Sequence, residues 1–151
     1  MKILQHPHPV LREKCAPVRV FDDALLDLAE DMIETMYDAP GRGLAAPQVG
    51  HAVRMFVMDT TWKEGEPSPL AFVNPQIIMA SDEAAFGEEG CLSLIGQSCK
   101  VRRPVEVTLR YQDLWGETHL DVFDGFAARC VQHERDHLDG ILCIDHAQVD
   151  A

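Results

Sequence analysis

The chain has 151 residues, of which 46% are hydrophobic, and its 25 acidic and 13 basic side chains give a formal net charge of −12. This length suits a single compact domain over 1–151, and the negative charge disfavours DNA or RNA binding because it repels polyanions. No segment approaches the roughly 18 apolar residues of a membrane span, and the N-terminus lacks the apolar run of a secretory signal. With five unclustered cysteines, which favour reduced thiols over a disulfide framework, these features predict a cytoplasmic protein.

The predicted elements begin with an amphipathic helix from Phe21 to Tyr37, where apolar residues recur at three- and four-residue steps. Strand patterns follow at residues 53–59, 70–79, 105–112 and 118–123. The segment 62–70, with a glycine and two prolines, predicts a surface loop between the first two strands, and the last two strands form a predicted hairpin. Because strands and helices do not alternate regularly, we expect an α+β fold with a mostly antiparallel sheet.

A C-terminal helix is predicted from Gly125 to Asp139, with Asp124 as its N-cap and Gly140 as its left-handed end. Within it, His133 and His137 lie one turn apart on the same face. Followed towards the N-terminus, that face continues through Cys130 and Phe126. We therefore expect the two histidines to extend an apolar stripe and to point into the core.

The spacing His-Glu-x-x-His is typical of metallohydrolases. In that arrangement His133 and His137 are nitrogen ligands of a metal, and Glu134 is the general base. The pattern would arise by chance in roughly 2% of chains of this composition, so a simple polar patch on the helix is the weaker interpretation.

An open catalytic site needs a third protein ligand. His146 follows His137 by nine residues, which does not fit the extended His-Glu-x-x-His-x-x-Gly-x-x-His spacing, so the ligand must come from upstream. Cys91, in Glu-Glu-Gly-Cys-Leu-Ser-Leu, is the best candidate, although an isolated cysteine is more often a small buried apolar residue. Its thiolate would complete a Cys-His-His set with one open position.

Three motifs occur in a characteristic order along the chain. They are GRGLAAPQVG (Gly41–Gly50), EGCLS (Glu89–Ser93) and QHERDH (Gln132–His137), and they resemble the signature motifs of the peptide deformylases. The segments HPHPVLR, VRRPVEVTLRYQDLWG and LDGILCID also resemble that family, so the resemblance covers nearly the whole chain. It implies a metal-dependent hydrolase that removes the N-formyl group from the initiator methionine of newly made peptides and releases formate.

The resemblance also implies roles for single residues. The side chain of Gln48 and the backbone N–H of Leu92 would donate hydrogen bonds to the oxygen that becomes negative during attack. Gly43 would offer its backbone to an extended peptide, and Glu89 would line the substrate pocket. Glu134 would take a proton from water and pass it to the departing amine.

The resemblance further implies one divalent metal ion held by Cys91, His133 and His137. Members of the family commonly use Fe²⁺, and Zn²⁺, Ni²⁺ or Co²⁺ would also suit this ligand set. The expected partners are N-formylmethionyl nascent peptides, and transient proximity to the ribosome is expected from the family alone.

Two positions depart from the family's pattern. Ile95 stands where a proline is usual, which frees the backbone and adds bulk beside the substrate, and Arg42 replaces a residue that is often apolar. These departures keep open a non-catalytic or substrate-altered paralogue. A zinc peptidase that cuts internal amide bonds is less favoured, because the downstream ligand is missing.

Overall fold

The computed structural model describes residues 1–147; the last four residues of the predicted domain, 148–151, lie outside the described residues. The helices are α1 (Asp23–Asp38), α2 (Gly125–His137) and α3 (Cys143–Ala147), with 3₁₀ helices η1 (Pro9–Arg12) and η2 (Ala46–Val49). The strands are β1 (Gly43–Ala45), β2 (Met55–Met58), β3 (Leu70–Ala80), β4 (Ala84–Gly90), β5 (Ser98–Pro104), β6 (Glu106–Gln112) and β7 (Thr118–Asp124).

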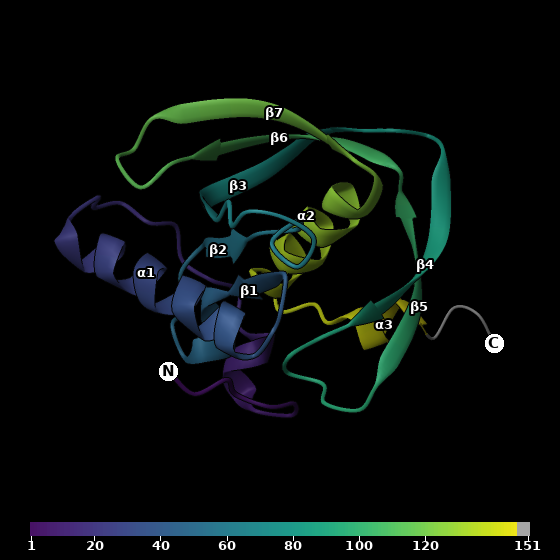
Figure 1. Ribbon diagram of the computed structural model, residues 1–151, viewed down its shortest axis with the longest axis horizontal. Helices are drawn as coiled ribbons and strands as arrows, with labels where there is room; N and C mark the ends of the chain where they lie inside the picture. Colours follow the sequence, from purple (N-terminus) through teal and green to yellow (C-terminus); the bar gives the residue numbers. More distant parts are fainter. Residues whose placement is uncertain (148–151) are drawn as a thin grey trace.

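The strands form two sheets around α2. A five-stranded sheet has the order β1-β2-β3-β6-β7, and β4 and β5 form a separate pair. The strand pairings within both sheets are antiparallel, which confirms the predicted α+β class. In Figure 1, α2 lies between the larger sheet and the β4–β5 pair, and α1 lies at the far side of the larger sheet. Helix α2 therefore carries its side chains towards both sheets.

Helix α1 forms close to its predicted position. Asp22 caps it, because its carboxylate accepts a hydrogen bond of 3.1 Å from the Leu25 N–H. The apolar face that the sequence pattern predicts is buried, with Ala29, Met32 and Met36 fully inaccessible to solvent. This face packs against β1 and β2 and fixes the position of the first motif.

The predicted β6–β7 hairpin is present, and β6 shows the expected alternation. Val107, Leu109 and Tyr111 are buried, whereas Glu106 and Arg110 are exposed. The strands β1, β4 and β5 were not predicted. In β5 an arginine, Arg103, occupies an inward position, which disguises the apolar alternation that marks a strand.

Helix α2 ends at His137, two residues before its predicted end, and Gly140 adopts the expected left-handed conformation with φ +73°. The prediction that Phe126 belongs to the inward stripe is wrong, since its side chain is 51% exposed. Phe126 lies in the first turn, before the helix enters the core, and the guanidinium of Arg42 stacks over its ring at 5.3 Å. Cys130, one turn further, is buried as expected.

Candidate metal centre and active site

The three predicted metal ligands meet in one place. Cys91 directly follows β4, while His133 and His137 lie on α2, and one ligand atom from each lies within 4.8 Å of the other two. The Cys91 Sγ is 3.5 Å from the His137 Nε2. His146, which the spacing argument excluded, instead bonds Asp136 at 2.9 Å.

The ring of His133 is oriented by a carboxylate behind it. Its Nδ1 lies 2.8 Å from the Glu89 Oε1, so the Nδ1–H donates to the carboxylate and Nε2 is the nitrogen left for a cation. Glu89 and His133 are both buried. The same carboxylate therefore fixes the tautomer and the direction of the ring.

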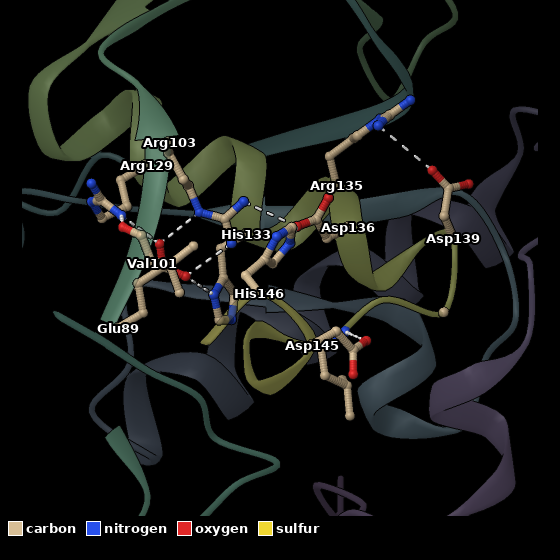
Figure 2. Close-up of polar contacts among 12 residues, drawn as sticks. Glu89, Val101, Arg103, Arg129, His133, Arg135, Asp136, Asp139, Asp145 and His146 are labelled. Atoms are coloured by element: carbon tan, nitrogen blue, oxygen red, sulfur yellow. Dashed lines mark hydrogen bonds and ion pairs between the residues drawn. The ribbon is translucent and has the colours of Figure 1, made fainter. Parts of the chain in front are cut away.

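Two arginines hold Glu89 in turn, as Figure 2 shows. Arg103 donates to both carboxylate oxygens at 2.6 and 2.9 Å, and the Arg129 Nη1 donates to Oε2 at 2.8 Å. Burial alone would raise the pKa of Glu89, but the hydrogen bonds from His133 and Arg103 hold that pKa well below its usual range. Glu89 borders the cavity, and its oxygens are committed to this network.

The network continues to the end of the motif helix. Arg103 also donates to Asp136 at 3.0 Å, and Asp136 in turn bonds His146. Sequence reasoning missed both Arg103 and Arg129. Cationic partners for Glu89 could have been expected from charge balance, since a buried carboxylate needs a compensating positive charge.

The imidazoles of His133 and His137 have opposite pKa shifts. Burial and the neighbouring His133 lower the pKa of His137 well below its ordinary value, which favours the neutral ring, the form that binds metals. Burial also disfavours the charged form of His133, but the hydrogen bonds to Cys91 and Glu89 outweigh burial and raise its pKa. The position between Cys91 and Glu89 therefore favours positive charge.

Glu134 is buried beside the first motif. Burial raises the pKa of its carboxyl to about 7, and within residues 1–147 its Oε1 has no hydrogen-bond partner. A Cβ at Gly43 would lie 2.5 Å from the Glu134 Oε2, so only glycine leaves this carboxylate its space. Gly43 thus has a packing role that the sequence interpretation did not include.

Both polar atoms of the Gln48 side-chain amide form hydrogen bonds. Its Oε1 accepts a hydrogen bond of 2.9 Å from the Ala45 N–H, and its Nε2 donates to the Ser93 Oγ at 3.0 Å. The same Nε2 lies 3.8 Å from the Cys91 Sγ. The 3₁₀ helix η2, which carries Gln48, therefore brings an amide donor beside the ligand cysteine. Leu92 follows that cysteine and covers Gly41.

These groups border a cavity of about 900 Å³. Gly43, Gln48, Cys91, His133 and Glu134 line its inner part. Ile95 and Arg42, the two departures from the family's pattern, also border it; Ile95 is 78% exposed, and the Arg42 Nη2 bonds the Glu64 Oε1 at 2.6 Å. The cavity is large enough to hold several residues of an extended peptide.

The donor set fits a divalent transition metal. One sulfur and two imidazole nitrogens suit Fe²⁺, Zn²⁺, Co²⁺ or Ni²⁺, and three protein ligands leave a position for a reacting group. The Glu89 carboxylate behind His133 is the kind of outer partner that metal-bound histidines have. The cluster is thus consistent with a catalytic metal centre.

Comparison with known proteins assigns the family. The family model of polypeptide deformylase matches residues 1–150. The chain belongs to the polypeptide deformylase family. The peptide deformylase of Brucella suis is 52% identical over 141 residues, covering 93% of this chain and 80% of that protein. The peptide deformylase of Phenylobacterium zucineum is 49% identical over 145 residues, covering 96% and 86%.

Solved structures of peptide deformylases share the fold. The Plasmodium falciparum deformylase has a TM-score of 0.94 and 40% identity, and the match covers 99% of this chain and 88% of that one. The Thermotoga maritima deformylase has a TM-score of 0.90 and 43% identity, with coverage of 96% and 95%. The resemblance to the peptide deformylases and the predicted α+β fold are therefore confirmed.

Membership of the deformylase family defines the activity. The protein is a metal-dependent hydrolase that removes the N-formyl group from formylmethionyl peptides. None of the helices in residues 1–147 combines the length and apolar composition that crossing a bilayer requires.

Proposed function

We propose that Cys91, His133 and His137 hold the catalytic cation and that Fe²⁺ is its native identity. The observation that carries the proposal is the convergence of these three ligand atoms at the cavity, whose lining includes Cys91, His133 and Glu134. A cation bound there polarises the formyl carbonyl and makes water more acidic. Sulfur and imidazole donors suit ferrous iron, and the family resemblance favours it over Zn²⁺, Ni²⁺ and Co²⁺.

Glu134 is the proton carrier of the proposed mechanism. Its carboxylate takes a proton from the attacking water and delivers it to the amine of the departing methionine. A pKa of about 7, caused mainly by burial, suits both directions of transfer, because the group then binds and releases a proton with similar ease near neutral pH. Formate and a free N-terminal methionine are the products.

Gln48 and Leu92 stabilise the oxyanion in this proposal. The Gln48 Nε2 lies within 3.8 Å of the Cys91 Sγ, and the Leu92 N–H belongs to the residue directly after that ligand. Two fixed donors next to the cation would stabilise the developing negative charge more than they stabilise the neutral formamide. Hydrogen bonds to Ala45 and Ser93 hold the Gln48 amide in place.

Gly43 binds the peptide backbone in this proposal. It begins β1, which is the first strand in the order β1-β2-β3-β6-β7 and so has one free edge. An extended peptide can pair with such an edge as an added strand. Glu89, which we expected to line the substrate pocket, borders the cavity and in this proposal also positions His133, because its oxygens bond that ring and two arginines.

The decisive experiment uses protein prepared without oxygen and loaded with iron. We expect formate release from a formyl-methionyl peptide and loss of that activity in Glu134→Ala, with one metal ion bound in both proteins. Glu30→Gln, on the exposed side of α1, serves as the control. No activity in either protein would favour a non-catalytic paralogue, whereas equal activity in both would show that Glu134 is not the proton carrier. Cleavage of an unmodified peptide would instead revive the zinc peptidase interpretation.

We also propose that the protein acts in the cytoplasm, transiently near the ribosome. Its substrates are newly made formylated chains, and Cys15, Cys91, Cys99, Cys130 and Cys143 are free thiols, which suits a reducing compartment. Pelleting of the protein with translating ribosomes, and its absence from the membrane fraction, would support this location.

A further inference from the structure

Three of the free cysteines lie together at one side of the cavity, and one of them, Cys91, lines it. Cys99 and Cys143 belong to one buried cluster, and Cys91 packs against it. Cys99 points inward from β5, and Cys143 begins α3. Cys91, Cys99 and Cys143 therefore pack together in one cluster, although they come from three separate segments of the chain. The remaining cysteines, Cys15 and Cys130, belong to a different core cluster.

The three thiols differ in their access to solvent. Cys91 is partly exposed and lines the cavity, whereas Cys99 and Cys143 are 4% and 3% exposed. A peroxide that enters the cavity therefore meets Cys91 first. Further oxidation of that sulfur to the sulfinic or sulfonic acid would be irreversible and would destroy the metal ligand.

We propose that Cys143 and Cys99 form a resolving dithiol that rescues Cys91 after oxidation by a hydroperoxide. In the first step the Cys91 sulfur takes one peroxide oxygen and becomes a sulfenic acid, and the O–O bond breaks with release of water. The Cys143 thiol then attacks this sulfur. The S–O bond breaks, a second water leaves, and a Cys91–Cys143 disulfide forms.

Exchange with the third thiol completes the cycle. Cys99 attacks the sulfur of Cys143, so the Cys99–Cys143 disulfide forms and Cys91 leaves as a thiol, ready to bind metal again. An external dithiol of the thioredoxin class then reduces the buried disulfide and is itself oxidised. Cys99 and Cys143 are buried in the same packed cluster, so the two thiols that form the final disulfide are already neighbours in the reduced protein.

The test uses zinc-loaded enzyme, because zinc has no redox chemistry of its own. The protein is treated with hydrogen peroxide, its remaining thiols are alkylated, and its peptides are mapped by mass spectrometry. Trypsin leaves Cys91 and Cys99 on one peptide, so fragmentation must assign the bonded cysteine. We expect a Cys99–Cys143 disulfide in wild type, with Cys91 recovered as an alkylated thiol.

Variants separate the steps. Cys99→Ala should trap the Cys91–Cys143 disulfide, and Cys143→Ala should accumulate sulfinic acid at Cys91. Cys15→Ala, which removes a buried thiol from the other cluster, should behave as wild type. Sulfinic acid at Cys91 in wild type without any Cys99–Cys143 disulfide would overturn the proposal. The mass-spectrometric readout does not depend on formate release, so the failure of the catalytic proposal and the failure of the resolving-dithiol proposal can be told apart. The disulfide map of the wild type is informative even where a variant does not fold.

Discussion

Gly43 shows how one residue of the first motif controls another in the third. Its missing side chain leaves room for Glu134, since any Cβ there would lie 2.5 Å from Oε2 and 2.9 Å from the carboxylate carbon. The close contact gives it a reason independent of any substrate.

We predict that Gly43→Ala displaces the Glu134 carboxylate and lowers kcat/KM sharply. A misplaced proton carrier loses most of the roughly 10²- to 10⁴-fold that general base catalysis contributes. Steady-state formate release and the metal content of the purified variant measure the effect. Gly65→Ala, where the nearest atom would lie at 3.8 Å, is the matched control. Full activity of Gly43→Ala would contradict the placement of Glu134.

Glu89 supports the site in two ways that its position in the sequence did not suggest, by orienting His133 and by pairing with Arg103. It is 6% exposed and compensates the charge of Arg103, which is 4% exposed. Breaking a buried ion pair by removing one partner typically costs about 3–5 kcal/mol, because the other charge stays buried and unpaired.

We predict that Glu89→Gln destabilises the protein and weakens metal binding together. The free energy of unfolding should fall by about 3 kcal/mol, and metal affinity should fall by about 10- to 100-fold because His133 loses its orienting partner. Denaturant titration and metal competition measure the two effects. Glu88→Gln, the exposed neighbour, should change neither. An unchanged metal affinity in Glu89→Gln would show that the ring needs no such support.

At the scale of elements, the strongest periodic patterns were predictable. Helix α1 and the β6–β7 hairpin have clear alternation of apolar and polar residues, so their burial followed from the sequence. The β4–β5 pair was missed. Its inward positions include two charged residues, Glu89 and Arg103, which form an ion pair once β4 and β5 are paired. The sequence of either strand alone does not reveal that ion pair, so neither strand shows an apolar inward face.

The residues of the site also divide into those that the sequence predicted and those that it did not. The spacing of His133 and His137 predicted two ligands, and Cys91 was selected by its motif. By contrast, the exposure of Phe126 and the inward direction of Arg129 depend on where the helix enters the core. Local spacing fixes what one helix face presents, but tertiary contacts decide which residues of that face are covered.

The end of α2 depends on Gly140. This residue has φ +73°, and a Cβ there would lie 2.5 Å from the backbone oxygen of Arg12, which cannot rotate away. Hydrogen bonds from Arg12 to the Gly140 carbonyl and to Asp145 tie the same turn to η1 and α3. The turn after α2 is therefore linked to η1 near the N-terminus and to α3 near the C-terminal end of the described residues.

We predict that Gly140→Ala destabilises the protein more than Gly96→Ala does. Gly96 has a similar φ of +78° but no atom within 4 Å of its would-be Cβ, so its replacement costs only the left-handed conformation, about 1–2 kcal/mol. Gly140→Ala adds a backbone clash, for which overpacking costs of about 1–3 kcal/mol are typical. Chemical denaturation measures both variants. Equal losses would mean that the contact with Arg12 relaxes freely.

For the whole molecule, the metal site joins parts of the chain that are far apart in sequence. Cys91 lies in the connection between β4 and β5, and both histidines lie on the helix that packs against the larger sheet. Unfolding separates these ligands, so a cation bound to the folded state alone stabilises that state by mass action. A cation at the proposed site would then couple the two sheets in stability as well as in catalysis.

We predict that removing the metal lowers the melting temperature of wild type. With free metal at about 100 times its Kd, the lost stabilisation is about 2.7 kcal/mol. For a chain of this size that corresponds to a fall of roughly 5–10 °C. Melting curves recorded with and without a chelator measure the difference. Cys91→Ser should melt at a temperature that hardly depends on the chelator, whereas Cys15→Ser should respond as wild type does. If chelation left wild type unchanged while its activity disappeared, the cation would serve chemistry alone and would not link the two sheets.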